Sequence, residues 1–179
     1  MTLSVANHTA SLPVAYRLYL PEAWAADPDR RAKAGVPDEV TFKTKPEIAL
    51  DQIKAAHADG VRPGIVLADA GYGADGTFRA GVSALGLSYA VGVQSTLSVW
   101  PPGQDPLPPK PWSGRGRPPS LVGRDPHHRP VSAKALAVSL TEDASVQTWR
   151  EGTNAPLSSR FAAVRVRPAS RDYNHATPP

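Results

Sequence analysis

The chain has 179 residues, a length that suits one ordinary domain or part of a larger one. It contains 20 Pro, no Cys, 20 basic and 16 acidic side chains. The lack of Cys excludes a disulfide framework, a thiolate zinc site, an iron–sulfur cluster and a cysteine nucleophile. No apolar run approaches the roughly 20 residues that span a bilayer and no signal-peptide pattern is present, so we expect a cytoplasmic protein with no membrane partner.

Charge and proline are unevenly distributed along the chain. Residues 1–99 carry 9 basic and 10 acidic side chains, whereas residues 100–179 carry 11 and 6. Ten of the 20 prolines lie between Pro101 and Pro130, and proline removes a backbone donor from helices and central strands. We therefore expect residues 100–130 to be irregular, basic and exposed. Such a segment suits a nucleic-acid contact or a solvated loop, and charge alone does not choose between them.

The first twenty residues predict a β-hairpin. Thr2–Ala6 forms a short strand, residues 7–11 supply turn formers, and Leu12–Leu20 alternates apolar residues at period two. This alternation predicts that one face of the second strand is buried.

A polar connection is expected over residues 21–46, followed by a helix. Thr44-Lys-Pro-Glu47 has the features of a helix start, with Pro in the first turn and Glu beside the positive end of the helix dipole. Asp59-Gly60 ends the helix. One face of this helix is apolar, formed by Ala49, Ile53 and Ala56 with Ile48 and Leu50 beside them.

The next segment predicts a parallel strand–helix–strand unit. Gly64–Ala68 is a continuous apolar run, as in a strand covered on both faces. A helix is expected from Gly76 to about Leu85, and a second buried strand from Leu87 to Gln94. Two strands joined by a helix at this spacing are expected to be parallel.

The C-terminal part predicts a helix over Val131–Leu140 and strands over Val146–Trp149 and Phe161–Arg167, the last with a basic face that includes Arg165. The fold class we expect is therefore α/β, with a mixed sheet, a Pro-rich basic loop and a small β/α insertion. The expected segments are the core (1–99), the irregular segment (100–130), the insertion (131–168) and a disordered tail (169–179).

The glycines after the Gly64–Ala68 strand form a Gly-x-Gly-x-x-Gly pattern at Gly71, Gly73 and Gly76. In dinucleotide-binding proteins such glycines let a pyrophosphate approach a helix N-terminus, and an acidic residue about 20 positions later binds the ribose. No Asp or Glu occurs between Gly76 and Asp105. The acidic residue that would bind the ribose is therefore missing, and the pattern does not indicate a dinucleotide-binding site.

Asp69, at the end of the same strand, supports two other interpretations. A carboxylate at the carboxyl end of a strand lies where open α/β sheets place their chemistry, and Mg²⁺ prefers carboxylate oxygens and water. Alternatively, Asp69 only caps the loop or helix that follows.

Several blocks in this order resemble the bacterial insertion-sequence transposases of the D-D-E type, which have a ribonuclease H-like core. The blocks are Leu12–Trp24, Val40–Lys45, Val66–Gly73, Val91–Gln94, Arg150–Gly152 and Leu157–Pro168. The resemblance implies a partial ribonuclease H-like core, DNA (the transposon ends) as the partner, and Mg²⁺ or Mn²⁺ as the cofactor. It also implies that Asp69 is the family's second metal-binding acid.

The resemblance also implies that two acids of the family are missing. The family's first Asp precedes the strand at Met1, and its Glu follows the strand near Arg167; neither Glu142 nor Glu151 takes that place. We therefore expect a truncated fragment with little or no activity alone. The alternatives are a non-catalytic basic DNA-binding remnant and a pseudogene product without function.

The basic segment holds the DNA-binding candidates. Arg115-Gly-Arg-Pro118 is similar to the core of AT-hook segments, whose arginines enter a narrow minor groove. Non-specific phosphate contact is the other possibility, and the adjacent His127 and His128 are expected to be solvated rather than metal-bound. The candidate DNA-binding residues are Lys110, Arg115, Arg117, Arg124 and Arg129.

Overall fold

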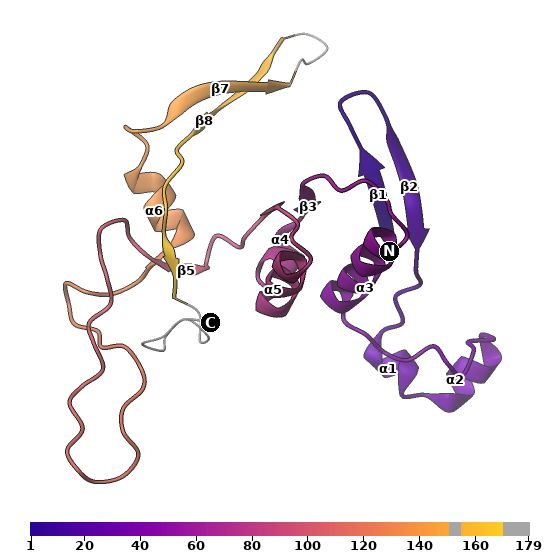
Figure 1. Ribbon diagram of the computed structural model, residues 1–179, viewed down its shortest axis with the longest axis horizontal. Coiled ribbons are helices and arrows are strands. Elements are labelled where there is room, and N and C mark those ends of the chain that lie inside the picture. Colours follow the sequence, from indigo (N-terminus) through magenta and orange to yellow (C-terminus); the bar gives the residue numbers. More distant parts are fainter. Residues whose placement is uncertain (151–154, 170–179) are drawn as a thin grey trace. The chain divides into compact units, whose positions relative to one another are not determined.

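A computed structural model describes residues 1–150 and 155–169 of the chain (Figure 1). The fold is mixed α/β, with small sheets and several helices. The chain divides into two compact units, Met1–Val93 (unit 1) and Gln94–Pro179 (unit 2). Each unit is described by itself below.

Unit 1 begins with the predicted hairpin. Strands β1 (Thr2–Ala6) and β2 (Ser11–Tyr16) are antiparallel, and Ala6 is paired with Ser11. The side-chain oxygen of Asn7 accepts hydrogen bonds at 2.8 Å from the N–H groups of Thr9 and Ala10, which stabilises the turn. The hairpin is confirmed, but the predicted burial of one face is wrong. The side chains of Leu12 and Tyr16 are 67% and 74% exposed, because a two-stranded sheet leaves them in solvent.

The expected polar connection contains two short helices, α1 (Glu22–Ala25) and α2 (Pro28–Lys33). Asp27 caps α2 by accepting a hydrogen bond from the Arg30 N–H at 3.0 Å, and Pro28 occupies the first turn. A cap followed by proline starts a helix even in a polar sequence. The absence of an apolar face explains why the sequence pattern did not predict these helices.

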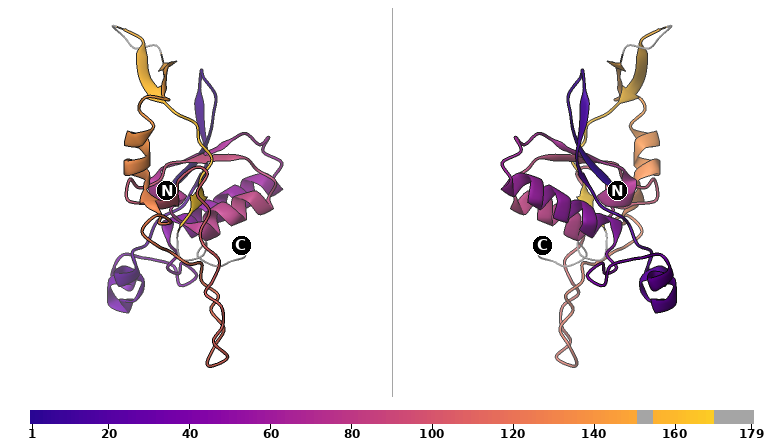
Figure 2. Two further views of the ribbon diagram at one scale, coloured as in Figure 1. Left: turned by 90° about the vertical axis from the view of Figure 1, so that its left-hand side faces the viewer. Right: turned by 90° about the vertical axis from the view of Figure 1, so that its right-hand side faces the viewer.

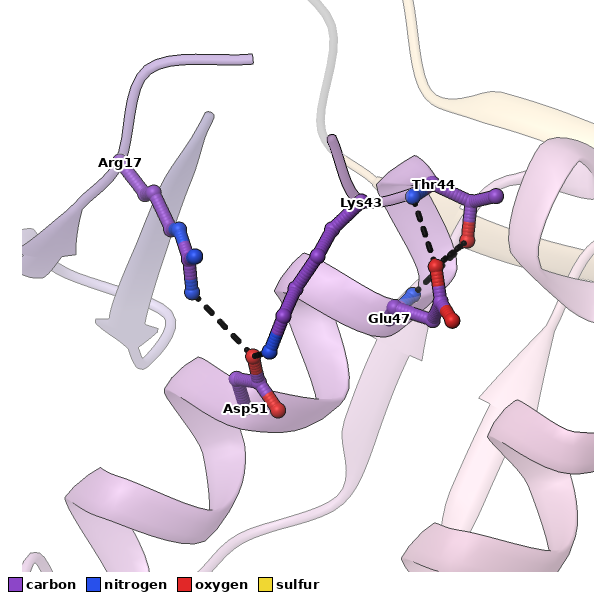
Figure 3. Close-up of polar contacts among 5 residues, drawn as sticks. All are labelled: Arg17, Lys43, Thr44, Glu47 and Asp51. Atoms are coloured by element: carbon purple, nitrogen blue, oxygen red, sulfur yellow. Dashed lines mark hydrogen bonds and ion pairs between the residues drawn. The ribbon is translucent and has the colours of Figure 1, made fainter. Parts of the chain in front are cut away.

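Helix α3 (Lys45–Ala58) confirms the predicted helix. Thr44 and Glu47 form a capping box: the Glu47 carboxylate accepts from the Thr44 N–H at 2.7 Å, and the Thr44 hydroxyl oxygen accepts from the Glu47 N–H at 3.4 Å (Figure 3). The Thr44 hydroxyl also donates to the Glu47 carboxylate at 2.7 Å; this hydrogen bond, followed by the one from the Thr44 N–H, lowers the pKa of Glu47. Ile48, Leu50 and Ile53 are buried on the inner face.

A cluster of charged side chains connects the end of the hairpin to α3. The Asp51 carboxylate oxygen Oδ2 lies 2.6 Å from Lys43 Nζ and 3.2 Å from Arg17 Nη1 (Figure 3). The hydrogen bond from Lys43 is the main cause of the lowered pKa of Asp51, and the charges of Lys43 and Arg17 add to it. Asp51 therefore holds two segments that are distant in sequence against one helix.

The strand–helix–strand unit has the predicted parallel pairing. Strands β3 (Val66–Ala68) and β4 (Tyr89–Val91) are joined through α4 (Ala70–Gly73) and α5 (Gly76–Ala84). The prediction that these strands are covered on both faces is wrong, since Leu67 is 76% exposed. The core of unit 1 lies on one side of the strands and is formed by Leu50, Ile53, Phe78 and Val82.

In unit 2, strand β5 (Ser98–Trp100) lies between β6 (Val131–Ser132) and β9 (Arg167–Pro168) in an antiparallel sheet. Helix α6 (Ala133–Ser139) follows β6 and is capped by the Ser132 hydroxyl. Trp100 is fully buried.

A second hairpin in unit 2 pairs β7 (Ser145–Arg150) with β8 (Leu157–Phe161). The prediction of one strand over Phe161–Arg167 is wrong. Strand β8 ends at Phe161, and Arg167 pairs with Trp100 in the other sheet, so the intervening residues leave the β conformation. The alternating sequence does not reveal that the two ends of the segment join different sheets.

The Pro-rich residues 101–130 form neither a helix nor a regular strand, whereas Trp100, the first residue of the segment predicted to be irregular and exposed, lies in β5 and is buried. The segment folds back on itself as a long loop (Figure 2), and an isolated bridge joins Leu107 to Gly123. Of the expected tail, residues 170–179 lie outside the described residues. Ala169 is buried, and its N–H donates to the Ser98 carbonyl oxygen at 2.9 Å.

Candidate functional site

Asp69 lies at the carboxyl end of β3 and begins α4. Its side-chain atom Oδ1 accepts a hydrogen bond from the Gly71 N–H at 2.8 Å. Its carbonyl oxygen accepts from the N–H groups of Tyr72 and Gly73, both at 3.1 Å. Asp69 therefore acts as a cap, one of the two roles suggested by the sequence.

The Asp69 side chain is nonetheless exposed, and its Oδ2 atom accepts no hydrogen bond from the residues that the structure describes. An exposed carboxylate with one uncommitted oxygen has the chemistry of a ligand for Mg²⁺ or Mn²⁺. Capping and metal binding are thus compatible at this residue, because they use different oxygens.

Tyr72 lies beside the carboxylate and packs into the core. Its ring centroid is 5.7 Å from that of Phe78, at an angle of 54° between the ring planes. Burial raises the pKa of the Tyr72 hydroxyl, and the negative charge of Asp69 raises it further. The hydroxyl therefore stays neutral near Asp69.

Gly73 and Gly92 form a close contact between α4 and the end of β4. A Cβ atom on Gly73 would lie 1.8 Å from the carbonyl oxygen of Gly92, so only glycine fits here. The guanidinium of Arg79 also donates to the carbonyl oxygen of Gly73. Gly73 is therefore required for close packing. The sequence pattern did not predict its partner Gly92, whose only local signal is that a glycine directly follows β4.

The N-terminus of α5 is occupied by the chain itself. Asp75 Oδ1 accepts a hydrogen bond from the Phe78 N–H at 2.7 Å. A carboxylate at this end of the helix takes the place that a pyrophosphate needs and repels its charge. This geometry agrees with the failure of the nucleotide hypothesis.

The acids of the chain do not gather around Asp69. Within residues 1–150 and 155–169, no group of three or more His, Asp or Glu side chains is placed to hold a metal ion. Glu142 is exposed in the turn after α6, in the other unit, and Glu151 lies outside the described residues. Asp69 therefore fits as one ligand of Mg²⁺ or Mn²⁺, whereas a two-metal site needs several carboxylates.

All five predicted DNA-contact residues are exposed in unit 2, in the long loop: Lys110, Arg115, Arg117, Arg124 and Arg129.

The tip of that loop has a defined conformation. The Trp112 indole N–H donates to the carbonyl oxygens of Arg115 and Gly116, at 3.3 and 3.2 Å. Gly114 and Gly116 have φ angles of 82° and 72°, which glycine adopts readily. The backbone of the Arg-Gly-Arg stretch is thus held by Trp112 while the arginine side chains point into solvent.

His127 and His128 take part in a local turn. Asp125 Oδ1 accepts from both of their N–H groups at 2.7 Å, and His128 Nδ1 lies 3.1 Å from the same oxygen. These contacts, the His128 N–H above all, lower the pKa of Asp125. The pair has no further metal-ligating partner within the described part of the chain.

The fold and this geometry describe a mixed α/β protein with an exposed carboxylate at the end of a parallel strand and a separate basic loop. A carboxylate at the carboxyl end of a strand lies where open α/β sheets place their chemistry. The sequence model of one family, described as DDE superfamily endonuclease, matches residues 1–156. The chain therefore belongs to the DDE superfamily endonucleases, and the resemblance to DDE transposases is confirmed at this level.

Other comparisons add no relative. No curated protein and no solved structure matches the chain. Among the described residues, no helix is long and apolar enough to cross a membrane.

Proposed function

We propose that this chain is part of a DDE transposase of an insertion sequence, whose intact form cleaves DNA at the transposon ends and transfers the strands. The observation that carries the proposal is the family match over residues 1–156, which spans Asp69 and the basic loop. Bound Mg²⁺ or Mn²⁺ would activate water and then a DNA 3′-hydroxyl for attack on phosphodiesters.

Asp69 is the proposed metal ligand of this chain. Its Oδ2 atom is the oxygen proposed to bind the metal, while Oδ1 keeps the hydrogen bond from the Gly71 N–H, which fixes the direction of the carboxylate. The Tyr72 hydroxyl, whose pKa is raised by burial and by the charge of Asp69, lies beside this carboxylate as a neutral group.

The basic loop is the proposed DNA contact. Its five exposed cations neutralise phosphates, and the ordered tip presents Arg115 and Arg117 together. This contact is expected to be salt-dependent and largely independent of sequence, unless the tip enters a narrow A·T minor groove.

We also propose that the chain has little strand-cleavage activity by itself, because one carboxylate does not hold a metal pair. Nicking of supercoiled plasmid in Mg²⁺ or Mn²⁺ tests this, with Asp69→Asn as the variant. Asn keeps an acceptor for the Gly71 N–H and removes the charge, and Asp75→Asn is the matched control at another cap.

Equal background nicking by all three proteins is the expected result. Nicking that is lost in Asp69→Asn and kept in Asp75→Asn would contradict the proposed inactivity while supporting the role of Asp69. Metal-dependent nicking that is unchanged in Asp69→Asn would contradict that role.

A non-catalytic DNA-binding remnant is the second candidate, favoured by the exposed cations of the loop. It predicts salt-sensitive DNA binding that is lost when Arg115 and Arg117 are neutralised. A product without function predicts no DNA binding and no cooperative unfolding of the chain.

A further inference from the structure

Helix α4 is a single turn, and its position determines where the Asp69 carboxylate points. So short a helix is not stable by itself, because too few hydrogen bonds form to offset the cost of nucleation. It is held instead by contacts with α5, beside which it lies (Figure 1). Helix α5 is anchored in the core of unit 1, where Phe78 and Val82 are 2% and 0% exposed.

Gly73 connects α5 to Asp69 through the two peptide groups in which it takes part. Its carbonyl oxygen accepts a hydrogen bond from the guanidinium of Arg79, which belongs to α5. Its N–H donates to the carbonyl oxygen of Asp69 at 3.1 Å. Gly73 is buried, and a buried carbonyl oxygen that loses its donor must reach water by opening the turn. Arg79 therefore stabilises the same turn that Asp69 begins.

The Arg79 hydrogen bond supplies a restraint that packing alone does not. The rings of Tyr72 and Phe78 also join α4 to α5, with their centroids 5.7 Å apart. A ring contact of this kind allows sliding, whereas a hydrogen bond from a charged donor fixes both distance and direction. Arg79 is half-buried, so water competes less for its guanidinium than at an exposed site.

We infer that Arg79 is a positioning residue for the metal ligand Asp69. Its hydrogen bond to the Gly73 carbonyl oxygen holds α4 in place. In this arrangement Asp69 Oδ1 accepts from the Gly71 N–H, and Oδ2 is left for the metal. Arg79 needs no contact with the metal for this role. The inference rests on the proposed function, in which the Asp69 carboxylate binds Mg²⁺ or Mn²⁺.

The first test titrates the full ¹⁵N-labelled chain with Mn²⁺ and measures the concentration that half-broadens the Gly71 amide signal. Arg79→Met removes the donor and keeps an unbranched apolar side chain. We expect this variant to need about tenfold more Mn²⁺, as is typical when a ligand loses its supporting hydrogen bond. Removing a positive charge near the site would by itself strengthen the binding of a cation. Unchanged or stronger Mn²⁺ binding by Arg79→Met would therefore overturn the inference.

Two further variants separate positioning from a general loss of stability. The contact uses one guanidinium nitrogen, Nη1, so Arg79→Lys keeps a charged donor and should restore most of the Mn²⁺ affinity. Thr44→Ala weakens the capping box of α3 and should leave the Mn²⁺ affinity unchanged. An Arg79→Lys variant that binds as weakly as Arg79→Met, or an equal loss in Thr44→Ala, would overturn the inference.

Amide hydrogen exchange tests the positioning without a metal. The N–H groups of Gly71 and Gly73 donate to the side chain and the carbonyl oxygen of Asp69, respectively. In Arg79→Met we expect both amides to exchange at least about tenfold faster, while the amide of Val82 in the buried part of α5 exchanges as before. Unchanged exchange at both glycines, or the same acceleration at Val82, would overturn the inference.

The two measurements separate this inference from the proposed function. If Mn²⁺ broadens no amide near Asp69 in the parent chain, the metal role of Asp69 is contradicted, and amide exchange alone decides whether Arg79 positions the carboxylate. Faster exchange in Arg79→Met with an unchanged Mn²⁺ affinity would overturn the inference, because Arg79 would then serve only the fold.

Discussion

Replacing Gly73 by Ala is expected to destabilise unit 1 by about 3 kcal/mol. The added Cβ would lie 1.8 Å from the carbonyl oxygen of Gly92 and 3.0 Å from its carbonyl carbon. An ordinary contact needs roughly 3.5 Å, so the backbone must move by more than about 1 Å. Overpacking of this kind costs about 1–3 kcal/mol. The hydrogen bond from the Gly92 N–H to the Ala68 carbonyl oxygen, 2.9 Å long, would weaken by up to about 1 kcal/mol more.

Two other glycines provide graded controls. A Cβ on Gly81 would lie 2.4 Å from Leu50 Cδ2, which belongs to a flexible side chain rather than to the backbone. Ala also gains about 1 kcal/mol over Gly inside α5, so the net loss for Gly81→Ala should stay below about 1 kcal/mol. At Gly64 a Cβ meets no atom within 4 Å, and Gly64→Ala should change stability by less than about 0.5 kcal/mol.

Urea unfolding followed by far-ultraviolet circular dichroism measures the three variants against the parent chain. The expected order of destabilisation is Gly73, then Gly81, then Gly64. A Gly73→Ala variant as stable as Gly64→Ala would refute the close packing of α4 against the end of β4. It would also reopen a ligand-binding role for the Gly71–Gly73 pattern.

Three further predictions concern charge and capping. Asp51→Asn should lower the unfolding free energy by up to about 1 kcal/mol at pH 7. Because Lys43 and Arg17 lower the Asp51 pKa, this stabilisation is present above the pKa of the unfolded chain, about 3.9, and is lost as the pH falls through the lower pKa of the folded chain. A pH-independent difference in urea stability would contradict it. Thr44→Ala should lower the unfolding free energy by about 1 kcal/mol and Thr44→Ser should restore it. Replacing Arg115 and Arg117 by Gln should reduce the salt slope of DNA binding by roughly 2, and an unchanged slope would exclude both contacts.

The sequence predicted those helix starts and turns that are formed by residues only a few positions apart in the chain. The capping box of Thr44 and Glu47 lies within one helical turn, and the α3 helix begins where the sequence predicts. The hairpin turn at Asn7 depends on side-chain to backbone bonds two and three residues away. Asp69 was predicted as a cap or a ligand because it directly follows an apolar run, and its capping bond is equally local.

The features that the sequence did not predict depend on distant partners. The Gly73 contact involves Gly92, which directly follows the next strand, β4. The end of β8 at Phe161 is set by the pairing of Arg167 with Trp100 in another sheet. Likewise, the apolar residue Leu67 predicts burial, but β3 borders an open groove, so no element of the described chain covers it.

The role of Asp69 as a metal ligand is tested most directly by titrating the ¹⁵N-labelled chain with Mn²⁺, whose unpaired electrons broaden the signals of nearby amides. The account predicts broadening at Ala70, Gly71 and Tyr72 in the parent chain and in Asp75→Asn, and its loss in Asp69→Asn. Broadening of the same amides to the same extent in Asp69→Asn, or none in the parent chain, would contradict it.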